Sequence, residues 1–324
     1  MKRREFITLL GGTAAFPRAA HAQQPAMPVI GFFHVGAREA FGHLVTAFHQ
    51  GLAASDLVEG RNVAILFRWA EGQVDRLPAL AADLVKRQPA VIVANSQPAL
   101  ELRKATATIP IVFVTADDPV KLGFVKSMNR PGGNMTGVHQ FTIALQAKRL
   151  GLLRDVVPKA RTIAVLVDSD FPTADVQLRD VQDAAARLGV QLVVARANAG
   201  SDFGGAFATF VQRQAEALLV SSSPFFNSRR VELVVLAARH NLPAIYEWRE
   251  FATAGGLVSY GHSIVETYRN AGIYAGRIIK GAKPADLPVL QPTKFELVIN
   301  ARTAKALGVK ISDNLITLAD EVIE

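Results

Sequence analysis

Residues with binding chemistry stand directly after the apolar segments of this sequence. In the first half of the chain we single out six of them: Phe33, His34, Ser96, Gln97, Thr115 and Asp117. In the second half we single out six more: Phe171, Ser222, Phe225, Tyr246, Glu247 and Trp248. Hydroxyl, imidazole, carboxylate and aromatic groups are what a concave site uses to orient and enclose a small molecule.

The polar residues of the first half fit two roles each. Ser96 begins a predicted helix, so its hydroxyl and the adjacent backbone amides either hold an anionic oxygen or cap the helix. Asp117 either caps the turn that follows it or faces a ligand. His34 is either a donor to the ligand or a surface or supporting group.

The residues of the second half are mostly aromatic. Phe171 and Phe225 lie in predicted loops, where they either pack beneath the loop or contact a ligand. Tyr246 and Trp248 offer flat surfaces on which a ligand can stack. Glu247 is either a solvated charge or a counter-ion for a ligand ammonium.

Catalytic and metal-binding motifs are missing from the sequence. It contains no G-x-S-x-G elbow, Walker loop, G-x-G-x-x-G or H-E-x-x-H pattern, and its histidines lack ligand spacing. The chain has no cysteine, which excludes a thiolate nucleophile and an iron–sulfur cluster. We therefore expect no cofactor and no metal, and a secreted α/β enzyme is the weaker alternative to a binding protein.

The elements that position these residues alternate between strand and helix. Apolar runs predict strands at 29–33, 63–69, 90–94 and 110–114, separated by helices at 39–55, 74–86 and 98–106. Continuous apolar runs of this kind are typical of parallel strands that are buried on both faces. The turn-rich segment 129–137 then interrupts the alternation and suggests a hinge.

The alternation resumes in the second half of the chain. Helices are predicted at 144–155, 174–188, 203–214 and 228–240, with strands at 162–167, 190–195, 217–220 and 243–246. A strand at 257–260, a helix at 264–280, a strand at 294–298 and a helix at 301–307 follow. The fold class is therefore α/β, with two Rossmann-like lobes built on parallel sheets. Ligands bind at the carboxyl ends of such strands, so the cleft between the lobes is the expected site.

The first 22 residues have the features of a secretory signal peptide. A basic start precedes a short apolar run, and Ala20-His21-Ala22 fits the small-x-small cleavage pattern. Arg3 and Arg4 also resemble the twin-arginine export motif, and the sequence leaves this route and an ordinary secretory signal both open.

Charge adds little to the functional prediction. The formal net charge is +8, with basic residues spread along the chain rather than gathered in a stripe. A nucleic-acid partner is therefore not expected.

Five segments together carry a resemblance to a known family. They are IPIVFVTADDPV at 109–120, PGGNMTG at 131–137, GGLVSYG at 255–261, GAKPAD at 281–286 and INARTAKALG at 299–308. In these segments the chain resembles the ABC-transporter substrate-binding protein family that includes tryptophan/tyrosine-binding members, a branch of the type 1 periplasmic binding protein fold. The resemblance implies two lobes joined by three crossovers, with the ligand trapped between them and delivered to a permease.

The sequence departs from amino-acid-binding relatives in the loops of the second half. Those relatives tend to carry Ser-Asp-Glu-Ser where this chain has residues 247–250 as Glu-Trp-Arg-Glu, and Asp-Asn where it has Ser223-Pro224. They also tend to carry Asn-Ser where it has Thr173-Ala174. The ligand is therefore expected to be a small organic acid with an apolar or aromatic body. An amino acid, with Glu247 or Asp117 as counter-ion, is the alternative.

These observations give one functional expectation. The chain is expected to be a monomeric periplasmic binding protein without a lipid anchor, working with the membrane permease and ATPase of an ABC importer. A role in feeding a sensory receptor is left open. The first lobe is expected to comprise 28–137 and about 261–288, and the second 138–260 and about 289–324.

Overall fold

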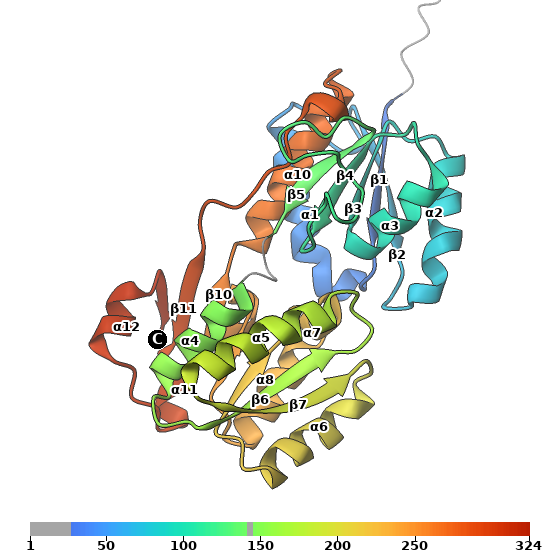
Figure 1. Ribbon diagram of the computed structural model, residues 1–324. Coiled ribbons are helices and arrows are strands. Elements are labelled where there is room, and N and C mark those ends of the chain that lie inside the picture. Colours follow the sequence, from blue (N-terminus) through green and yellow to red (C-terminus); the bar gives the residue numbers. More distant parts are fainter. Residues whose placement is uncertain (1–26, 141–144) are drawn as a thin grey trace, which may run out of the picture.

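The computed structural model describes residues 27–140 and 145–324 (Figure 1). The predicted signal peptide, residues 1–22, lies outside the described residues. The described chain is α/β and contains two separate sheets. The predicted fold class is confirmed, and we propose that the two sheets are the centres of the two lobes expected from the sequence.

The first sheet has five parallel strands in the order β2-β1-β3-β4-β5. Its strands are β1 (Val29–His34), β2 (Ala64–Trp69), β3 (Val91–Asn95), β4 (Ile111–Thr115) and β5 (Met135–His139). Strands β3, β4 and β5 are buried along their whole length, because helices cover both faces of the sheet.

The faces of this sheet are covered by different helices. The covering elements are α1 (Arg38–Ala53), α2 (Leu77–Lys86), α3 (Ser96–Ala105) and α10 (Ile264–Ile279), and the short helix η1 (Val74–Arg76) precedes α2. Phe32 packs with α1 and α10, whereas Phe33 packs with α2 and α3 on the opposite face. Successive side chains of a strand point to opposite faces, so His34 lies on the same face as Phe32.

The second sheet has seven strands in the order β12-β11-β10-β9-β8-β6-β7. Its strands are β6 (Thr162–Asp168), β7 (Gln191–Ala197), β8 (Ala217–Val220), β9 (Ala244–Tyr246), β10 (Val258–Gly261), β11 (Glu296–Asn300) and β12 (Glu321–Ile323). The pairing is parallel except between β10 and β11, which run antiparallel.

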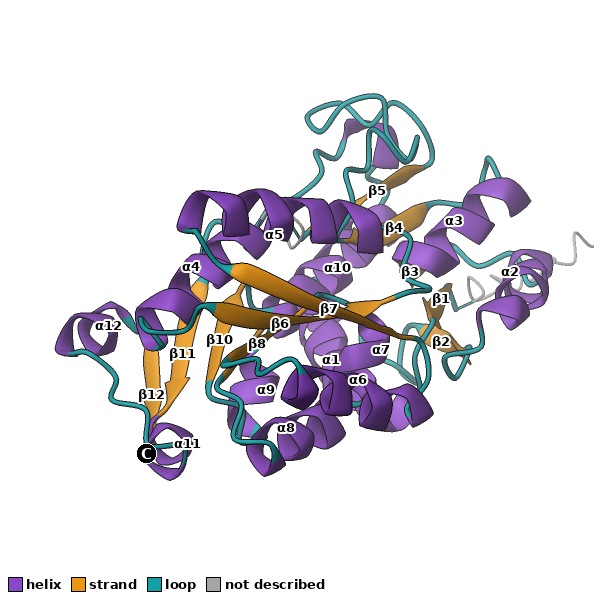
Figure 2. Cartoon of the chain, turned by 60° about the horizontal axis from the view of Figure 1, so that its bottom comes forward, coloured by secondary structure: helices purple, strands orange, loops and turns teal. Residues whose placement is uncertain are grey.

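Helices also cover both faces of the second sheet (Figure 2). Helices α4 (Gln146–Val156) and α5 (Ala174–Leu188) lie on one face. The other face is covered by α6 (Ser201–Gln212), α7 (Pro224–Ser228), α8 (Arg230–Arg239) and α9 (Arg249–Thr253). Helices α11 (Ala301–Ala306) and α12 (Asp313–Leu318) flank β11 and β12.

The chain returns to the first sheet after building most of the second. Helix α10 lies against α1 in the upper part of Figure 1, whereas β11 and β12 complete the lower sheet. Between them, η3 (Pro284–Asp286) leads to a stretch that runs beside β5, where Leu290 N donates to the Gly137 carbonyl oxygen at 2.9 Å. The buried apolar cluster beneath α1 and α10 is continuous with that beneath α6 and α8, so the two halves of the molecule pack directly against each other.

The predicted hinge at 129–137 needs correction. Residues 135–139 form β5 within the first sheet, and the chain leaves this sheet only after His139. A Cβ at position 137 would lie 2.0 Å from the Phe113 carbonyl oxygen, so Gly137 is needed for the close approach of β4. Strand β12 and the short helices α9 and α12 are further elements that the sequence pattern did not indicate.

The contact between α1 and α10 depends on glycine and gives a first prediction. A Cβ added at Gly51 would lie 1.9 Å from the Arg269 carbonyl oxygen, whereas one added at Gly42 in the same helix meets nothing within 4 Å. We expect Gly51→Ala to lower the free energy of unfolding by roughly 1–3 kcal/mol, because backbone must move. The matched Gly42→Ala control should raise it by up to about 1 kcal/mol, because alanine restricts the unfolded chain. Urea denaturation measures both, and equal effects would refute the packing argument.

Candidate ligand-binding site

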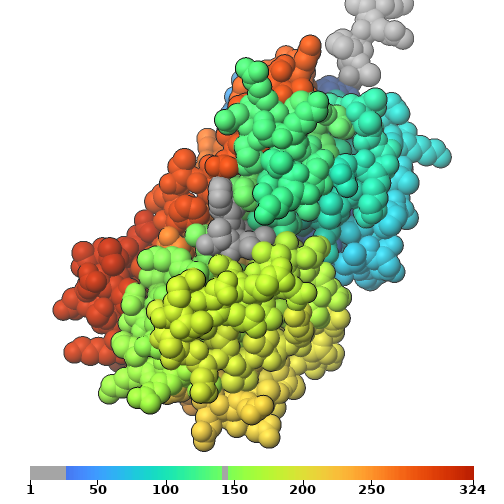
Figure 3. Space-filling view, in the orientation of Figure 1, coloured from blue at the N-terminus to red at the C-terminus, as the bar shows by residue number. Residues whose placement is uncertain are grey.

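Two adjoining cavities lie between the sheets, and each is lined by residues from both halves of the molecule. The inner cavity has a volume of about 30 Å³ and the outer cavity about 720 Å³. Phe171 and Pro224 line both cavities and separate them. Figure 3 shows the blue-to-green half above the yellow-green half, in contact with it across the middle of the molecule.

His34 supplies a neutral donor at the inner cavity. It ends β1, is 3% exposed, and lies with its ring centroid 4.3 Å from that of Phe41. Burial, with a smaller contribution from His43, lowers the pKa of His34 to about 3. The Gly36 backbone N–H donates to His34 Nδ1 at 2.9 Å, so the single ring proton resides on Nε2.

Ser96 and the start of α3 form the adjoining wall. Asn95 is the N-cap residue, and its Oδ1 accepts a hydrogen bond from Val35 N at 3.0 Å, which fixes the loop after β1 to the end of β3. Ser96 Oγ donates to Thr115 Oγ1 at 3.0 Å. The amides at the start of this helix face the same end of the sheet as the cavity, and a helix N-terminus is a natural site for an anionic oxygen.

Aromatic side chains fill much of the inner cavity. Phe41 and Tyr268 contribute from the first half of the molecule, and Phe171 and Trp248 from the second. Trp248 is 5% exposed, and its Nε1 has no hydrogen-bond partner among the described residues. A buried indole N–H without a partner is costly, so it is available to an acceptor on a ligand.

Glu247 faces the inner cavity from the second half, and Arg149 lies behind it. Arg149 on α4 is fully buried; its Nε donates to the Tyr260 carbonyl oxygen at 2.7 Å and its Nη1 to Ser222 Oγ at 2.9 Å. Burial lowers the pKa of Arg149, and the negative charge of Glu247 opposes that shift. The guanidinium therefore compensates the charge of Glu247 from the protein side.

Two glutamines complete this network around Ser222. Gln177 Oε1 accepts from Ser222 N and its Nε2 donates to the Ser222 carbonyl oxygen, each at 2.9 Å. Gln146 Nε2 donates to Gln177 Oε1 and, at 3.3 Å, to Ser222 Oγ. The loop after β8 is thus held by hydrogen bonds from α4 and α5.

Asp117 lies at the contact between the two halves. It is 4% exposed, and its Oδ1 has no hydrogen-bond partner among the described residues. Burial raises the pKa of Asp117 to about 6, against the opposing effect of hydrogen bonds with the hydroxyls of Thr173 and Thr115. Burial therefore disfavours the ionised carboxylate, and the hydroxyls of Thr173 and Thr115 compensate its charge only in part.

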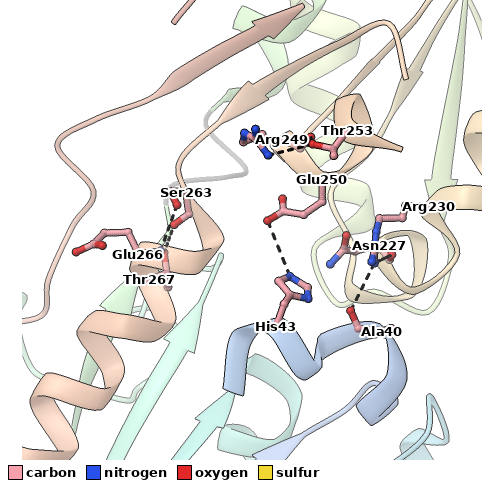
Figure 4. Close-up of polar contacts among 10 residues, drawn as sticks. All are labelled: Ala40, His43, Asn227, Arg230, Arg249, Glu250, Thr253, Ser263, Glu266 and Thr267. Atoms are coloured by element: carbon pink, nitrogen blue, oxygen red, sulfur yellow. Dashed lines mark hydrogen bonds and ion pairs between the residues drawn. The ribbon is translucent and has the colours of Figure 1, made fainter. Parts of the chain in front are cut away.

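Polar contacts also join the two halves at the rim (Figure 4). His43 Nε2 on α1 lies 3.9 Å from Glu250 Oε1, and Arg230 Nη1 donates to the Ala40 carbonyl oxygen at 3.5 Å. Burial, and next the charge of Arg230, lower the pKa of His43, whereas burial raises the pKa of Glu250. Long contacts of this kind are weak, so they permit the two halves to separate.

Residues 36–323 match the family model described as "ABC transporter substrate binding protein". The chain belongs to this family. Within the described residues of this substrate-binding protein, no group of three or more His, Cys, Asp or Glu side chains is arranged to hold a metal ion. No helix in the described ranges is both long and apolar enough to cross a membrane.

Individual relatives agree with the family assignment. The substrate-binding protein is 26% identical over 270 residues to a tyrosine-binding protein of Clostridioides difficile, covering 81% of this chain and 76% of the relative. It matches the structure of an ABC domain in complex with L-Trp from Streptococcus pneumonia with a TM-score of 0.81 at 23% identity, covering 91% of this chain and 99% of the other. The resemblance to the type 1 periplasmic binding fold is confirmed.

A third relative was solved without ligand. It is the open structure of a substrate-binding protein with adhesive properties from Clostridium difficile, which matches with a TM-score of 0.66 at 23% identity. The match covers 92% of this chain and 99% of the other.

The structure brings half of the sequence-predicted site residues to the inner cavity of the substrate-binding protein. These are His34, Ser96, Phe171, Ser222, Glu247 and Trp248. Gln97 and Phe225 line the outer cavity instead. Thr115 and Asp117 line neither cavity. Thr115 lies behind Ser96, and Asp117 lies at the contact between the two halves of the molecule.

Two predicted residues are placed away from both cavities. Phe33 packs with α2 and α3 on the far face of the first sheet. Tyr246 is 1% exposed and stacks on Phe251 with ring centroids 4.6 Å apart. Neither residue contributes a surface to the cavities, so we exclude both from the proposed site.

Arg149 and its glutamine partners were missed by the sequence analysis. The buried residues of α4 include positions 146, 149, 150, 153 and 156, the spacing of a helix face that packs against a core. A charged residue within that stripe must have partners inside the protein, and this was the available signal for Arg149.

The lowered pKa of His34 gives a prediction for its protonation state. In the folded protein the ring should stay neutral, with its proton on Nε2, from pH 7 down to about pH 4, because burial holds its pKa near 3. In the urea-unfolded chain the same ring should ionise near pH 6.5. Nitrogen-15 NMR of the imidazole distinguishes these states. An imidazolium at pH 5 in the folded protein would contradict the assigned tautomer and its donor role.

The raised pKa of Asp117 predicts a pH-dependent penalty. The unfolded carboxyl ionises near pH 3.8 and the folded one near pH 6, so stability falls as pH rises through this window and stays reduced above it. Asp117→Asn should raise the free energy of unfolding at pH 8 by about 2–3 kcal/mol and change it little below pH 4. The exposed neighbour Asp118, replaced by Asn, is the matched control and should show no such pattern. Destabilisation by Asp117→Asn at pH 8 would show that the carboxylate is well solvated.

Proposed function

We propose that this chain is the solute-binding component of an ABC importer and that it acts in the periplasm. It holds a small organic acid with an apolar or aromatic body between its two lobes. The carboxylate of the ligand lies against His34 Nε2 and the start of α3, and the body lies against Trp248 and Phe171. The loaded protein delivers this ligand to a membrane permease driven by an ATPase. It works as a monomer, without cofactor and without catalysis.

The balance of charge around the inner cavity carries this proposal. One wall offers His34 as a neutral donor, together with the amides of α3. Ser96 joins them when its hydrogen bond with Thr115 is reversed, so that Thr115 Oγ1 donates to Ser96 Oγ and the Ser96 proton turns to the ligand. On the opposite wall the carboxylate of Glu247 is compensated by the buried guanidinium of Arg149. A ligand carboxylate gains hydrogen bonds at the first wall, whereas a ligand ammonium competes with Arg149 for Glu247.

The relative positions of the lobes support a trapping mechanism. At the same sequence identity of 23%, the chain superposes better on the relative in complex with L-Trp than on the ligand-free, open relative, with TM-scores of 0.81 and 0.66. A closed arrangement also accounts for the burial of His34 and Trp248. Opening of the lobes would expose these groups to an incoming ligand.

An aromatic amino acid is the second candidate ligand. It is favoured by two relatives, a tyrosine-binding protein and a protein in complex with L-Trp. Glu247 would then be the partner of the ligand ammonium, while Arg149 keeps its hydrogen bonds to Ser222 and to the Tyr260 carbonyl oxygen.

Matched ligands that differ only in the ammonium group test the proposal. We expect calorimetry to show that 3-(indol-3-yl)propanoate binds at least tenfold more tightly than L-tryptophan, because the acid lacks the group that competes for Glu247. Thermal denaturation provides a second readout, since a ligand at 100 times its Kd adds about 2.7 kcal/mol. Tight binding of L-tryptophan, with the acid ignored, would establish the second candidate instead.

A variant of Ser96 tests the wall that supplies hydrogen-bond donors, formed by His34, Ser96 and the start of α3. Ser96→Ala should weaken binding of 3-(indol-3-yl)propanoate by about tenfold, because a hydrogen bond to a charged oxygen is worth roughly 1.5–3 kcal/mol. Ser127→Ala is the control, since Ser127 is exposed and its hydroxyl bonds only within the turn to Arg130. Equal affinity of the Ser96→Ala variant and the wild type, measured by calorimetry, would remove Ser96 from the site.

A further inference from the structure

The groups that recognise a ligand and the space that accommodates one lie in different cavities. The inner cavity, with His34, Ser96 and Trp248 on its walls, measures about 30 Å³, room for only about two water molecules. The outer cavity measures about 720 Å³, within the range of roughly 300–1,000 Å³ that is typical of small-molecule sites. A ligand bound by the inner groups therefore has its available space on the other side of Phe171.

The outer cavity is part of the same cleft rather than a separate surface hollow. Its walls include the loops that follow β1 and β2 in the first lobe and β6 and β7 in the second, together with the starts of α1, α3 and α8 and the short helix α7. These are carboxyl ends of parallel strands, where α/β proteins bind ligands. Because both lobes contribute, the cavity closes around a ligand with the same movement that closes the inner cavity.

Phe171 forms the partition between the two cavities. It is 6% exposed and lines both of them. Its backbone N–H donates to the Asp168 carbonyl oxygen at 3.3 Å, and Asp168 Oδ1 accepts from Asp170 N at 3.1 Å. The turn that carries the ring is thus fixed at the junction of the two cavities.

The lining of the outer cavity defines the chemistry that it would take. Apolar surface comes from Val35, Val74 and Phe225, and neutral hydrogen-bonding groups come from Gln97 and Asn198. The charged residues of the lining are four acids and two arginines: Glu39, Glu71, Asp168, Asp170, Arg229 and Arg230. The excess of acids disfavours a second carboxylate on the ligand.

We propose that the ligand is an elongated monocarboxylic acid, longer than a free amino acid, whose head lies in the inner cavity and whose neutral, amphipathic body passes Phe171 into the outer cavity. This inference rests on the proposed function, because it takes the inner cavity as the site of the carboxylate. It adds that the body of the ligand is long and carries no charge. Relatives that bind free amino acids do not indicate either property.

Acids of different length, used with a variant that fills the outer cavity, test the proposal. The probes are 3-phenylpropanoate and 6-phenylhexanoate. Ala199 is exposed to the outer cavity, so Ala199→Trp fills that space without disturbing the core. Ala208→Trp is the matched control, because Ala208 is exposed on α6 and lines neither cavity.

Calorimetry should show that the wild type binds 6-phenylhexanoate at least tenfold more tightly than 3-phenylpropanoate. Ala199→Trp should remove that gain and change the affinity for 3-phenylpropanoate less than twofold, and Ala208→Trp should leave both affinities unchanged. Equal affinity for the two acids, or an equal effect of Ala199→Trp on both, would overturn the elongated ligand while leaving the proposed function intact. Binding of neither acid would overturn both.

Charge is tested with a third probe. Octanedioate and octanoate have the same length and differ in a second carboxylate at the far end. Octanoate should bind at least tenfold more tightly, because the second carboxylate would lie near Glu39 and Glu71. Tighter binding of octanedioate would show that the body of the ligand is anionic and would overturn the neutral body that we propose.

Discussion

The buried guanidinium of Arg149 organises the second lobe's half of the site. A charge taken out of water is tolerated only when partners surround it, and this one bonds to the ends of β8 and β10 and lies near Glu247 after β9. Three strand ends are therefore held around one side chain of α4. That arrangement fixes the position of Ser222. It also compensates the charge of Glu247, so this wall presents no uncompensated acidic group to the cavity.

In the first lobe, the residues that line the cavity are held in place without a buried ion. Its wall is fixed by short neutral hydrogen bonds, from Val35 N to Asn95 and from Ser96 to Thr115. Asp117 is the exception, since its ionised carboxylate is buried and poorly compensated at the contact with the other lobe. The wall of the first lobe is thus fixed by neutral hydrogen bonds, whereas the contact between the lobes includes Asp117, whose ionised form is more stable in water.

The sequence predicted the order of helices and strands well, but it did not show which face of each strand points to the cleft. Alternating apolar runs and amphipathic segments predicted the order of strands and helices, and the ends of strands located His34, Ser96 and Glu247. A strand that is apolar throughout carries no signal of which side faces the cleft, so Phe33 and His34 could not be told apart until α1 and α10 were placed. The turn-rich segment predicted at 129–137 overlaps the first three residues of β5, because Gly137 lowers strand propensity, although the neighbouring β4 requires a glycine there.

The first lobe can finish folding only late in synthesis, because it includes helix α10. It packs on α1, and Lys280 bonds to Asp56 across a separation of 224 residues. At typical rates of synthesis of about 5–20 residues per second, the first half of the chain waits roughly 10–40 s for this helix to emerge. During that time α1 can pack on β1 through Phe48 and Phe32, but its face around Gly51 lacks its native partner, so the first lobe completes its packing only after α10 has emerged.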